Sequence, residues 1–211
     1  MSWESLQRVY PWPREAPGLA PDRQNHGVCK GSWRAALAGI AAPVVLEVGV
    51  YLGGTAQWLL SNYQSLRHVG IDVWNAGFCL DRDRRFPPEW NGRDPLAQYH
   101  ANMREWQDRC VAVQATSVPG MSAVADHVQP DVVFIDASHD YYSVLEDIRA
   151  AVRLFPRAAV CGDDYGRKAP GSGQLEVRAA VDQAAKELGC KVLAGPGEGR
   201  FWRFEEAEPC G

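Results

Sequence analysis

Short runs of apolar residues alternate with longer amphipathic stretches from about residue 31 onward. An apolar run bounded by polar or turn residues is typical of a strand that is buried on both faces of a parallel sheet. Apolar residues at helical spacing between two such runs predict the crossover helix that parallel strands require. The alternation therefore predicts an α/β protein with a mainly parallel sheet.

The pattern predicts strands over residues 44–48, 68–72, 110–114, 131–135 and 157–162, and helices over residues 31–41, 95–107, 119–128, 141–154 and 174–188, with a further helix through Ser61. Two last strands, 190–193 and 200–204, are separated only by the turn AGPGEG. That connection is too short for a crossover helix and predicts an antiparallel hairpin. Together these elements predict a Rossmann-like, doubly wound sheet of seven strands, mostly parallel with a C-terminal antiparallel hairpin.

Two stretches fall outside this alternation. Residues 1–30 show no clear periodicity, but they carry Trp3, Tyr10 and Trp12 among prolines. Because such large apolar side chains need a surface to cover, we interpret this segment as an arm or lid over the substrate crevice. An arm that docks on a second subunit of a homo-oligomer is the alternative. Residues 75–94 are polar and interrupted by prolines, which indicates an inserted substrate loop.

Composition narrows the class of protein. With 211 residues, 46% of them hydrophobic and 23% charged, the chain is predicted to form one soluble domain over residues 1–211. Its net charge is −4 and its Lys and Arg residues are scattered, so no nucleic-acid partner is expected. No apolar run approaches the roughly 20 residues that cross a bilayer, and no signal peptide is visible, so we expect a cytoplasmic protein without membrane contact. The six cysteines form no CxxC pair, which argues against a zinc site.

A glycine turn joins the first strand to its helix in the segment VVLEVGVYLGGTAQWLL. Gly49 allows a positive φ, while Gly53 and Gly54 let a helix begin against a ligand. The pattern G-x-G-x-x-G is absent, and the carboxylate of Glu47 suits a cofactor with an amino group and a sulfonium better than a pyrophosphate, which it would repel. The turn therefore favours a nucleoside cofactor other than a dinucleotide. A plain strand-to-helix turn is the alternative.

Two residues at the end of the second strand, Asp72 and Trp74, fit the same cofactor. Asp72 closes that strand, where a carboxylate can accept hydrogen bonds from both ribose hydroxyls of a nucleoside. Trp74 follows closely and either packs against the adenine or the substrate or belongs to the core.

Three carboxylates end two later strands. Asp136 closes one strand, and Asp163 and Asp164 close the next. Since the carboxyl ends of parallel strands form the ligand crevice, we expect these carboxylates to converge on one point. They would repel one another without a cation or another counter-charge, which predicts a site for a hard cation such as Mg²⁺. The alternative is a Gly-Asp-Asp-Tyr turn that caps the next segment.

The chain from about Gly31 to Phe204 resembles the class I S-adenosylmethionine-dependent methyltransferases, whose first motif looks like Glu47 to Thr55 here. The form EVGxxxGxT and the acidic pair are most similar to the metal-dependent O-methyltransferases, which include the catechol, caffeoyl-coenzyme A and macrolide or aminocoumarin sugar enzymes. The resemblance implies a cofactor pocket lined by Glu47, Gly49, Tyr51, Gly53, Gly54, Thr55, Asp72, Trp74, Thr116, Ser117 and Asp136. Thr116 and Ser117 fall where family members contact the adenine, although Ser117 could equally cap the next helix.

The resemblance also implies catalytic residues. His139 follows Asp136 by three residues, at the position where catechol-type enzymes carry a lysine base. Histidine suits this role because its unperturbed pKa lies near neutrality. The alternative is a histidine that only hydrogen-bonds the next helix or orients a metal ligand. Asp140, Glu146 and Asp147 are expected on the solvated start and outer face of that helix.

We therefore expect an S-adenosylmethionine-dependent methyltransferase that uses Mg²⁺ or a similar divalent cation to methylate a hydroxyl of a small molecule or sugar. In that chemistry the metal, held by Asp136, Asp163 and Asp164, lowers the pKa of the hydroxyl and aligns it with the methyl group. Two alternatives stay open. One is a metal-independent enzyme that methylates nitrogen or a carboxylate, and the other is a non-catalytic module that binds S-adenosylmethionine.

Overall fold

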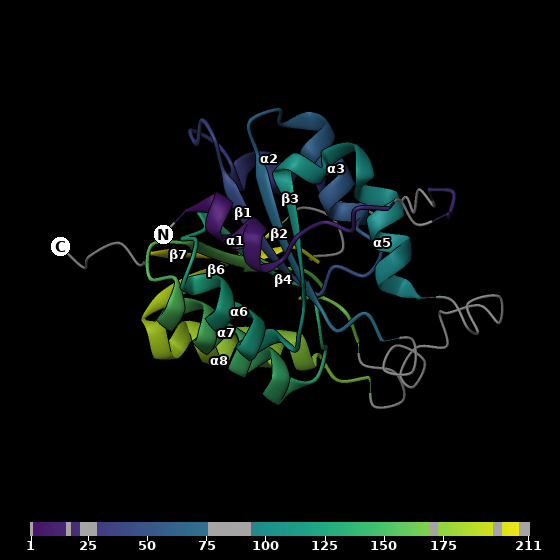
Figure 1. Ribbon diagram of the computed structural model, residues 1–211. Helices are drawn as coiled ribbons and strands as arrows, with labels where there is room; N and C mark the ends of the chain where they lie inside the picture. The colour runs from purple at the N-terminus through teal and green to yellow at the C-terminus, as the bar shows by residue number, and fades with distance from the viewer. Residues whose placement is uncertain are drawn as a thin grey trace.

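The computed structural model describes residues 2–15, 18–21, 29–75, 94–168, 173–195 and 200–206. Seven strands form one sheet in the order β3-β2-β1-β4-β5-β7-β6 (Figure 1). The strands are β1 (Val44–Val48), β2 (Arg67–Asp72), β3 (Cys110–Gln114), β4 (Val132–Ile135), β5 (Ala159–Gly162), β6 (Cys190–Ala194) and β7 (Trp202–Glu206). The expected doubly wound sheet of seven strands is thus confirmed.

Only β7 runs against the other strands. Strands β1 to β5 pair in parallel, and β7 is antiparallel to both β5 and β6, with Gly162 opposite Trp202. The predicted C-terminal hairpin is therefore present, and its second strand is inserted between β5 and the hairpin's first strand. This insertion brings the residues before β7 to the carboxyl end of β5.

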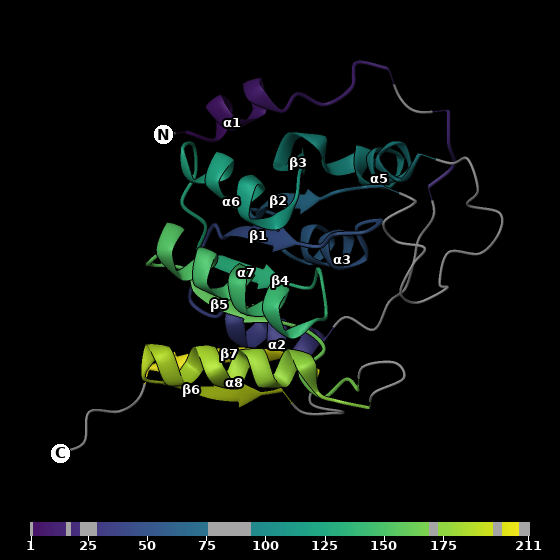
Figure 2. The same cartoon turned by 90° about the horizontal axis from the view of Figure 1, so that it is seen from below.

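Helices cover both faces of the sheet (Figures 1 and 2). Helices α6, α7 and α8 pack on one face, and α2, α3 and α5 pack on the other. Their bounds are α1 (Trp3–Val9), α2 (Lys30–Ala36), α3 (Gly54–Asn62), α5 (Pro95–Met103), the 3₁₀ helix η2 (Arg104–Arg109), α6 (Ser117–Ala125), α7 (Tyr141–Leu154) and α8 (Glu176–Leu188). Among the described residues, no helix is long and apolar enough to span a membrane.

Local sequence accounts for α7, which carries the candidate site at its start. Asp140 caps the helix, because its carboxylate accepts a hydrogen bond of 3.0 Å from the backbone N–H of Ser143. Val144, Ile148 and Ala151 recur at helical spacing and are buried against the sheet. The cap and the apolar stripe together fix where the helix begins and which face it presents to β4 and β5.

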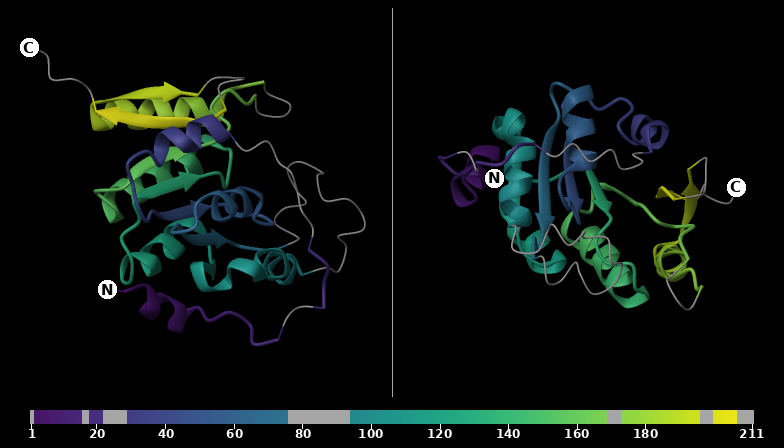
Figure 3. Two further views of the ribbon diagram at one scale, coloured as in Figure 1. Left: turned by 90° about the horizontal axis from the view of Figure 1, so that it is seen from above. Right: turned by 90° about the vertical axis from the view of Figure 1, so that its right-hand side faces the viewer.

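Helix α1 belongs to residues 1–30, the segment that we interpret as an arm or lid, and it packs on the body of the protein. Helix α1 lies beside α6 at the β3 edge, toward the end where the strands begin (Figures 2 and 3). Trp3 and Leu6 are 5% and 0% exposed and belong to the core of that face. The guanidinium of Arg67, the first residue of β2, lies 5.3 Å from the Trp3 ring. Trp12 reaches the other face, where its indole N–H donates to the carbonyl of Cys110 over 2.5 Å.

Other differences from the sequence are small. The helix predicted over residues 31–41 ends at Ala36, before a turn in which Gly39 has φ of 82°. The helix predicted over 95–107 divides after Met103 into α5 and η2, and η2 contains a kink at Trp106. Most of the predicted substrate loop, together with residues 22–28 of the N-terminal arm, lies outside the described residues.

The burial of Trp3 predicts a structural role for α1. Replacing Trp3 with Ala should lower the free energy of unfolding by about 3 kcal/mol, because a buried indole leaves a cavity. Denaturant unfolding followed by fluorescence or circular dichroism measures this loss. The matched control is Val9→Ala on the same helix, which should have little effect because Val9 is 54% exposed. Unchanged stability with a weaker acceptor affinity in Trp3→Ala would contradict the structural role and support the lid interpretation.

Candidate active site

The turn from β1 to α3 is shaped by glycine. Gly49, Tyr51 and Gly53 adopt positive φ angles of 86°, 53° and 86°. A Cβ atom on Gly49 would overlap the carbonyl oxygen of Asp136 and the backbone of Ala137, so no other residue fits between the ends of β1 and β4. Gly53 forms the N-cap of α3 and lies against Tyr99.

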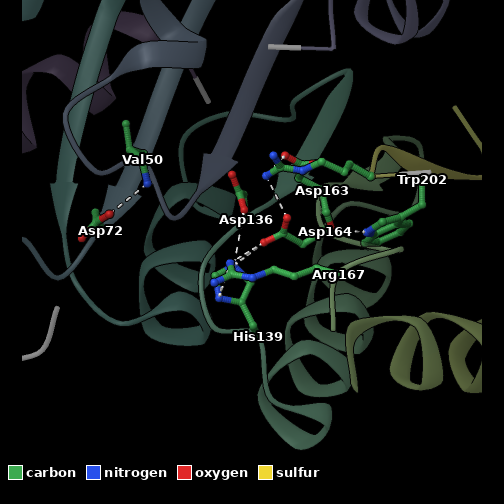
Figure 4. A network of polar contacts seen from close by, with 9 residues as sticks. Val50, Asp72, Asp136, His139, Asp163, Asp164, Arg167 and Trp202 are labelled. Carbon is green, nitrogen blue, oxygen red and sulfur yellow. Dashed lines mark hydrogen bonds and ion pairs between the residues drawn. The ribbon is translucent and has the colours of Figure 1, made fainter. Parts of the chain in front are cut away.

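This loop is held in place by its neighbours before any ligand binds. One oxygen of Asp72 accepts hydrogen bonds from the backbone N–H groups of Val50 (Figure 4) and Tyr51, at 2.9 and 2.8 Å. The other oxygen accepts from the N–H of Trp74 at 2.8 Å. The indole of Trp74 donates to the carbonyl of Tyr51, and the side chain of Asn102 donates to that of Leu52. Asp72 therefore ties the end of β2 to the glycine loop.

A chain of buried polar groups lies beneath the loop. Glu47 is 2% exposed, its carboxylate lies 2.7 Å from Nε2 of His68, and Thr55 also hydrogen-bonds it. On its other side the His68 ring hydrogen-bonds the thiol of Cys110, which in turn hydrogen-bonds the hydroxyl of Tyr99. Burial raises the pKa of Glu47, and hydrogen bonds to Cys110 and Glu47 raise the pKa of His68 to about 9 although burial opposes its charge. The two groups therefore share a proton at neutral pH.

A second polar cluster lies at the carboxyl ends of β4 and β5 (Figure 4). His139 Nε2 is 3.0 Å from an Asp164 oxygen and 3.7 Å from an Asp136 oxygen. One donor atom from each of these three residues lies within 4.8 Å of the others. Asp163 is outside this group, and one of its oxygens is buried without a hydrogen-bond partner. The cluster thus centres on Asp136, His139 and Asp164.

Two arginines complete the cluster. Arg167 Nη1 lies 2.7 Å from Asp164 and 3.3 and 3.4 Å from the two ring nitrogens of His139. Arg200 Nη2 lies 2.8 Å from the other oxygen of Asp164 and 3.2 Å from Asp163. Asp164 itself is 2% exposed and adopts φ of 61°, a conformation that hydrogen bonds from three side chains stabilise.

The surroundings shift the pKa values of the residues in this cluster. Burial raises the pKa of Asp136 to about 7, with further contributions from the charges of Asp163 and Asp164. Burial opposes charge on His139, yet its hydrogen bonds to Asp136 and Asp164 raise the pKa of His139 to about 9. Asp164 moves the other way: although burial opposes it, hydrogen bonds from His139 and Arg167 hold its pKa below the ordinary value. The cluster therefore keeps Asp164 ionised and places one exchangeable proton on Asp136 and His139.

Comparison with known proteins identifies the fold and the family. A family model described as a methyltransferase domain matches residues 46–165, more than half of the chain. The chain belongs to this methyltransferase family. No curated protein matches it.

Solved structures agree with the family. The chain is 21% identical to the cofactor-bound protein Rv0187 from MTB, with a TM-score of 0.57 over 95% of this chain and 84% of that one. It is 14% identical to an O-methyltransferase from Bacillus cereus in complex with SAH, with a TM-score of 0.56 over 95% and 93% of the two chains. A precorrin-6y C5,15-methyltransferase from Geobacter metallireducens is also 14% identical, with a TM-score of 0.56 over 88% and 84%. At these identities the likeness is one of fold and confirms the expected Rossmann-like sheet, while the family model confirms the expected methyltransferase.

The residues predicted to line the cofactor pocket of this methyltransferase fall into two groups, one on the glycine loop and one in the interior. Gly49, Tyr51, Gly53 and Gly54 form the loop and the start of α3, beside Asp72, as expected. Glu47 and Thr55 instead hydrogen-bond in the interior, and Trp74 is buried against the Tyr99 ring. Neighbouring protein groups hydrogen-bond the polar atoms of Glu47 and Trp74, and the predicted contacts of these two residues with the cofactor stay predictions.

Thr116 and Ser117 begin α6 after β3, where the adenine contact is predicted. Thr116 is the N-cap residue but makes no side-chain capping hydrogen bond. Ser117 hydrogen-bonds Asp147, which is 4% exposed in α7. The expectation that Asp147 lies on the solvated face of α7 is therefore wrong, since this carboxylate joins α7 to the start of α6. The expectation for Asp140 at the helix start is confirmed.

Sequence reasoning located the acids of the second cluster but not their partners. The predicted metal ligands Asp136 and Asp164 come together, whereas Asp163 turns to Arg200 and His139 takes its place in the group. Arg167 and Arg200 were missed because both stand in segments rich in turn residues, and no local pattern marks an arginine as buried or exposed. The only available signal was the predicted need of three carboxylates for a counter-charge.

The hydrogen bonds of Asp72 predict a double effect of its removal. Asp72→Ala should weaken binding of S-adenosylmethionine or its demethylated product at least tenfold, because the variant loses a proposed ribose acceptor and frees three backbone N–H groups. Isothermal titration calorimetry measures the affinity. Asp126→Ala, at an exposed position beyond α6, serves as the control. Equal affinity in wild type and Asp72→Ala would remove this residue from the pocket.

The packing of Gly49 predicts a large loss of stability on substitution. Gly49→Ala should lower the free energy of unfolding by more than about 2 kcal/mol, since it combines an unfavourable φ with a collision against β4. Gly39→Ala is a matched control, because Gly39 has φ of 82° but open space around it. Urea unfolding of both variants separates the collision from the φ cost. Equal losses in the two variants would show that contact with Asp136 does not constrain this position.

Proposed function

We propose that this methyltransferase transfers the methyl group of S-adenosylmethionine to a hydroxyl of a small molecule, with Asp136 and His139 as the proton acceptor. The observation that supports this proposal is their position and exposure. Both side chains lie at the carboxyl end of β4, next to the glycine loop, and keep 32% and 37% of their surface exposed. They are therefore accessible to an acceptor placed beside the cofactor.

The chain's residues fit this cofactor. The loop from Gly49 to Gly53 forms a backbone cradle, and Asp72 stands at its side with about one of its four lone pairs left for a ribose hydroxyl. When bound, S-adenosylmethionine supplies a methyl group on a positively charged sulfur. Because Gly49 packs directly against the Asp136 backbone, the loop that would hold the cofactor borders the cluster that contains Asp136 and His139.

The transfer requires the acceptor to lose a proton. The new oxygen–carbon bond forms as the sulfur–carbon bond breaks, and the hydroxyl proton passes to the Asp136 and His139 pair. The electron pair of the broken bond stays on sulfur, so the product is a neutral thioether. His139 must first release the proton that its carboxylate neighbours hold, which makes the deprotonated pair the active form.

A divalent cation is not part of this proposal. The buried free oxygen of Asp163 and the spacing of Asp136, His139 and Asp164 would suit one, but Arg167 and Arg200 already occupy both oxygens of Asp164. The side chains as they lie do not fit the Mg²⁺ expected from the sequence. No step of the reaction is therefore assigned to it.

The test is a panel of small acceptors that carry a hydroxyl, an amine or a carboxylate, assayed by release of the demethylated cofactor. Hydroxyl acceptors should be methylated, with kcat/KM rising with pH through a midpoint near pH 9, where half of the His139 rings have lost their proton, and levelling off above it. His139→Gln should lower kcat roughly 100- to 10,000-fold, the range typical of a lost general base, and flatten this profile, while leaving calorimetric binding of the demethylated cofactor intact.

His127→Gln is the control, because this histidine bonds Ser5 at the far end of α6. Methylation of amines or carboxylates alone would overturn the hydroxyl assignment. An unaltered pH profile in His139→Gln would remove the proton acceptor role while leaving the acceptor class standing.

A further inference from the structure

Arginine side chains stand where a metal-dependent enzyme of this fold would need a cation. Arg167 follows β5 by five residues and Arg200 precedes β7 by two. Both guanidinium groups contact the carboxylate of Asp164, one at each oxygen, at 2.7 and 2.8 Å. Asp164 is 2% exposed and the Arg167 side chain 19% exposed, so their contact is only weakly screened by solvent, whereas the Arg200 side chain keeps 45% of its surface exposed.

The position of Arg200 follows from the pairing of strands. Gly162 of β5 is opposite Trp202 of β7, and continuing this antiparallel register places Arg200 opposite Asp164. The backbone N–H of Tyr165 donates to the Arg200 carbonyl at 2.9 Å, and the Trp202 indole donates to the Asp163 carbonyl at 3.1 Å (Figure 4). The guanidinium is therefore held at the acids by the sheet itself and is not a long side chain that happens to reach them.

The charges of the cluster balance without a metal. Three carboxylates face two guanidinium groups, which remain charged at any physiological pH, and the His139 ring. A divalent cation placed among Asp136, His139 and Asp164 would lie next to Arg167 Nη1, which is within 3.4 Å of both His139 nitrogens. Its repulsion by two positive groups would offset the attraction of the acids.

The coordination chemistry leads to the same result. Mg²⁺ needs several oxygen lone pairs in near-octahedral order. Asp164 already accepts hydrogen bonds from Arg200 on one oxygen and from Arg167 on the other, which also faces His139 at 3.0 Å. Asp163, the third ligand expected from the sequence, faces Arg200 and lies outside the group of converging donor atoms.

We infer that Arg167 and Arg200 replace the divalent cation of the metal-dependent enzymes, so that this methyltransferase needs no metal. Only the consequence for the acceptor, given next, rests on the proposed function. A cation template binds two oxygens of its substrate, whereas a site without one does not demand a second oxygen beside the reacting group. The acceptor therefore needs only one hydroxyl and no second oxygen beside it.

Manganese binding to the full-length chain tests this inference without any acceptor. Electron paramagnetic resonance of Mn²⁺ should show no saturable binding to the wild type at millimolar concentration. The double variant Arg167→Gln/Arg200→Gln should gain one site, because the acids then lose their counter-charges. Arg149→Gln is the matched control, since Arg149 pairs with the exposed Glu187 away from the cluster. Circular dichroism checks that each variant is folded.

Stoichiometric Mn²⁺ binding to the wild type that is lost in Asp164→Asn would overturn the inference, and this measurement does not depend on the double variant. A folded double variant that gains no site would also contradict it, because the arginines would then not be standing in for a cation. Neither readout uses catalysis, so a failure here is distinct from a failure of the hydroxyl assignment.

Discussion

The close contact between Gly49 and the Asp136 backbone is the constraint on which the site depends. The N–H of Asp136 donates to the carbonyl of Val48, and the N–H of Gly49 donates to that of Ile71, both at 2.8 Å. These bonds join the carboxyl ends of β4, β1 and β2. Because no side chain separates Gly49 from Ala137, the cofactor loop and the acid cluster share one wall. A larger residue would move the two apart, and with them the cofactor and the group that receives the proton.

Two buried pairs of opposite charge support this wall from different sides. Glu47 and His68 lie under the glycine loop, and Asp164 with its arginines lies behind Asp136. Each pair gathers a carboxylate and a cation that would be costly to bury alone. Their value is therefore in position more than in net stability: Asp164, which both arginines contact, adopts a positive φ angle.

The sequence predicted what depends on local pattern. Apolar runs located every strand to within two residues, and acids at strand ends correctly placed Asp136 beside Asp164 because parallel strands end at one edge. It did not predict contacts that depend on pairing between distant segments. Arg200 reaches Asp164 only because β7 inserts beside β5, and Asp147 is buried only because α7 turns it toward Ser117. Helix α1 was missed because one short helix with two apolar anchors, Trp3 and Leu6, has too few turns to show a period.

The arginines also explain how His139 can serve as a base. When the ring gives up its proton, Asp136 and Asp164 lose a positive neighbour, and a buried carboxylate without a partner would oppose that loss. Asp164 keeps Arg167 and Arg200 throughout, so its charge stays paired whether or not His139 is protonated. Only Asp136 then loses its positive neighbour, and it keeps contact with solvent, because 32% of its side chain is exposed. The groups that make a metal unnecessary are thus the same ones that allow the proton to move.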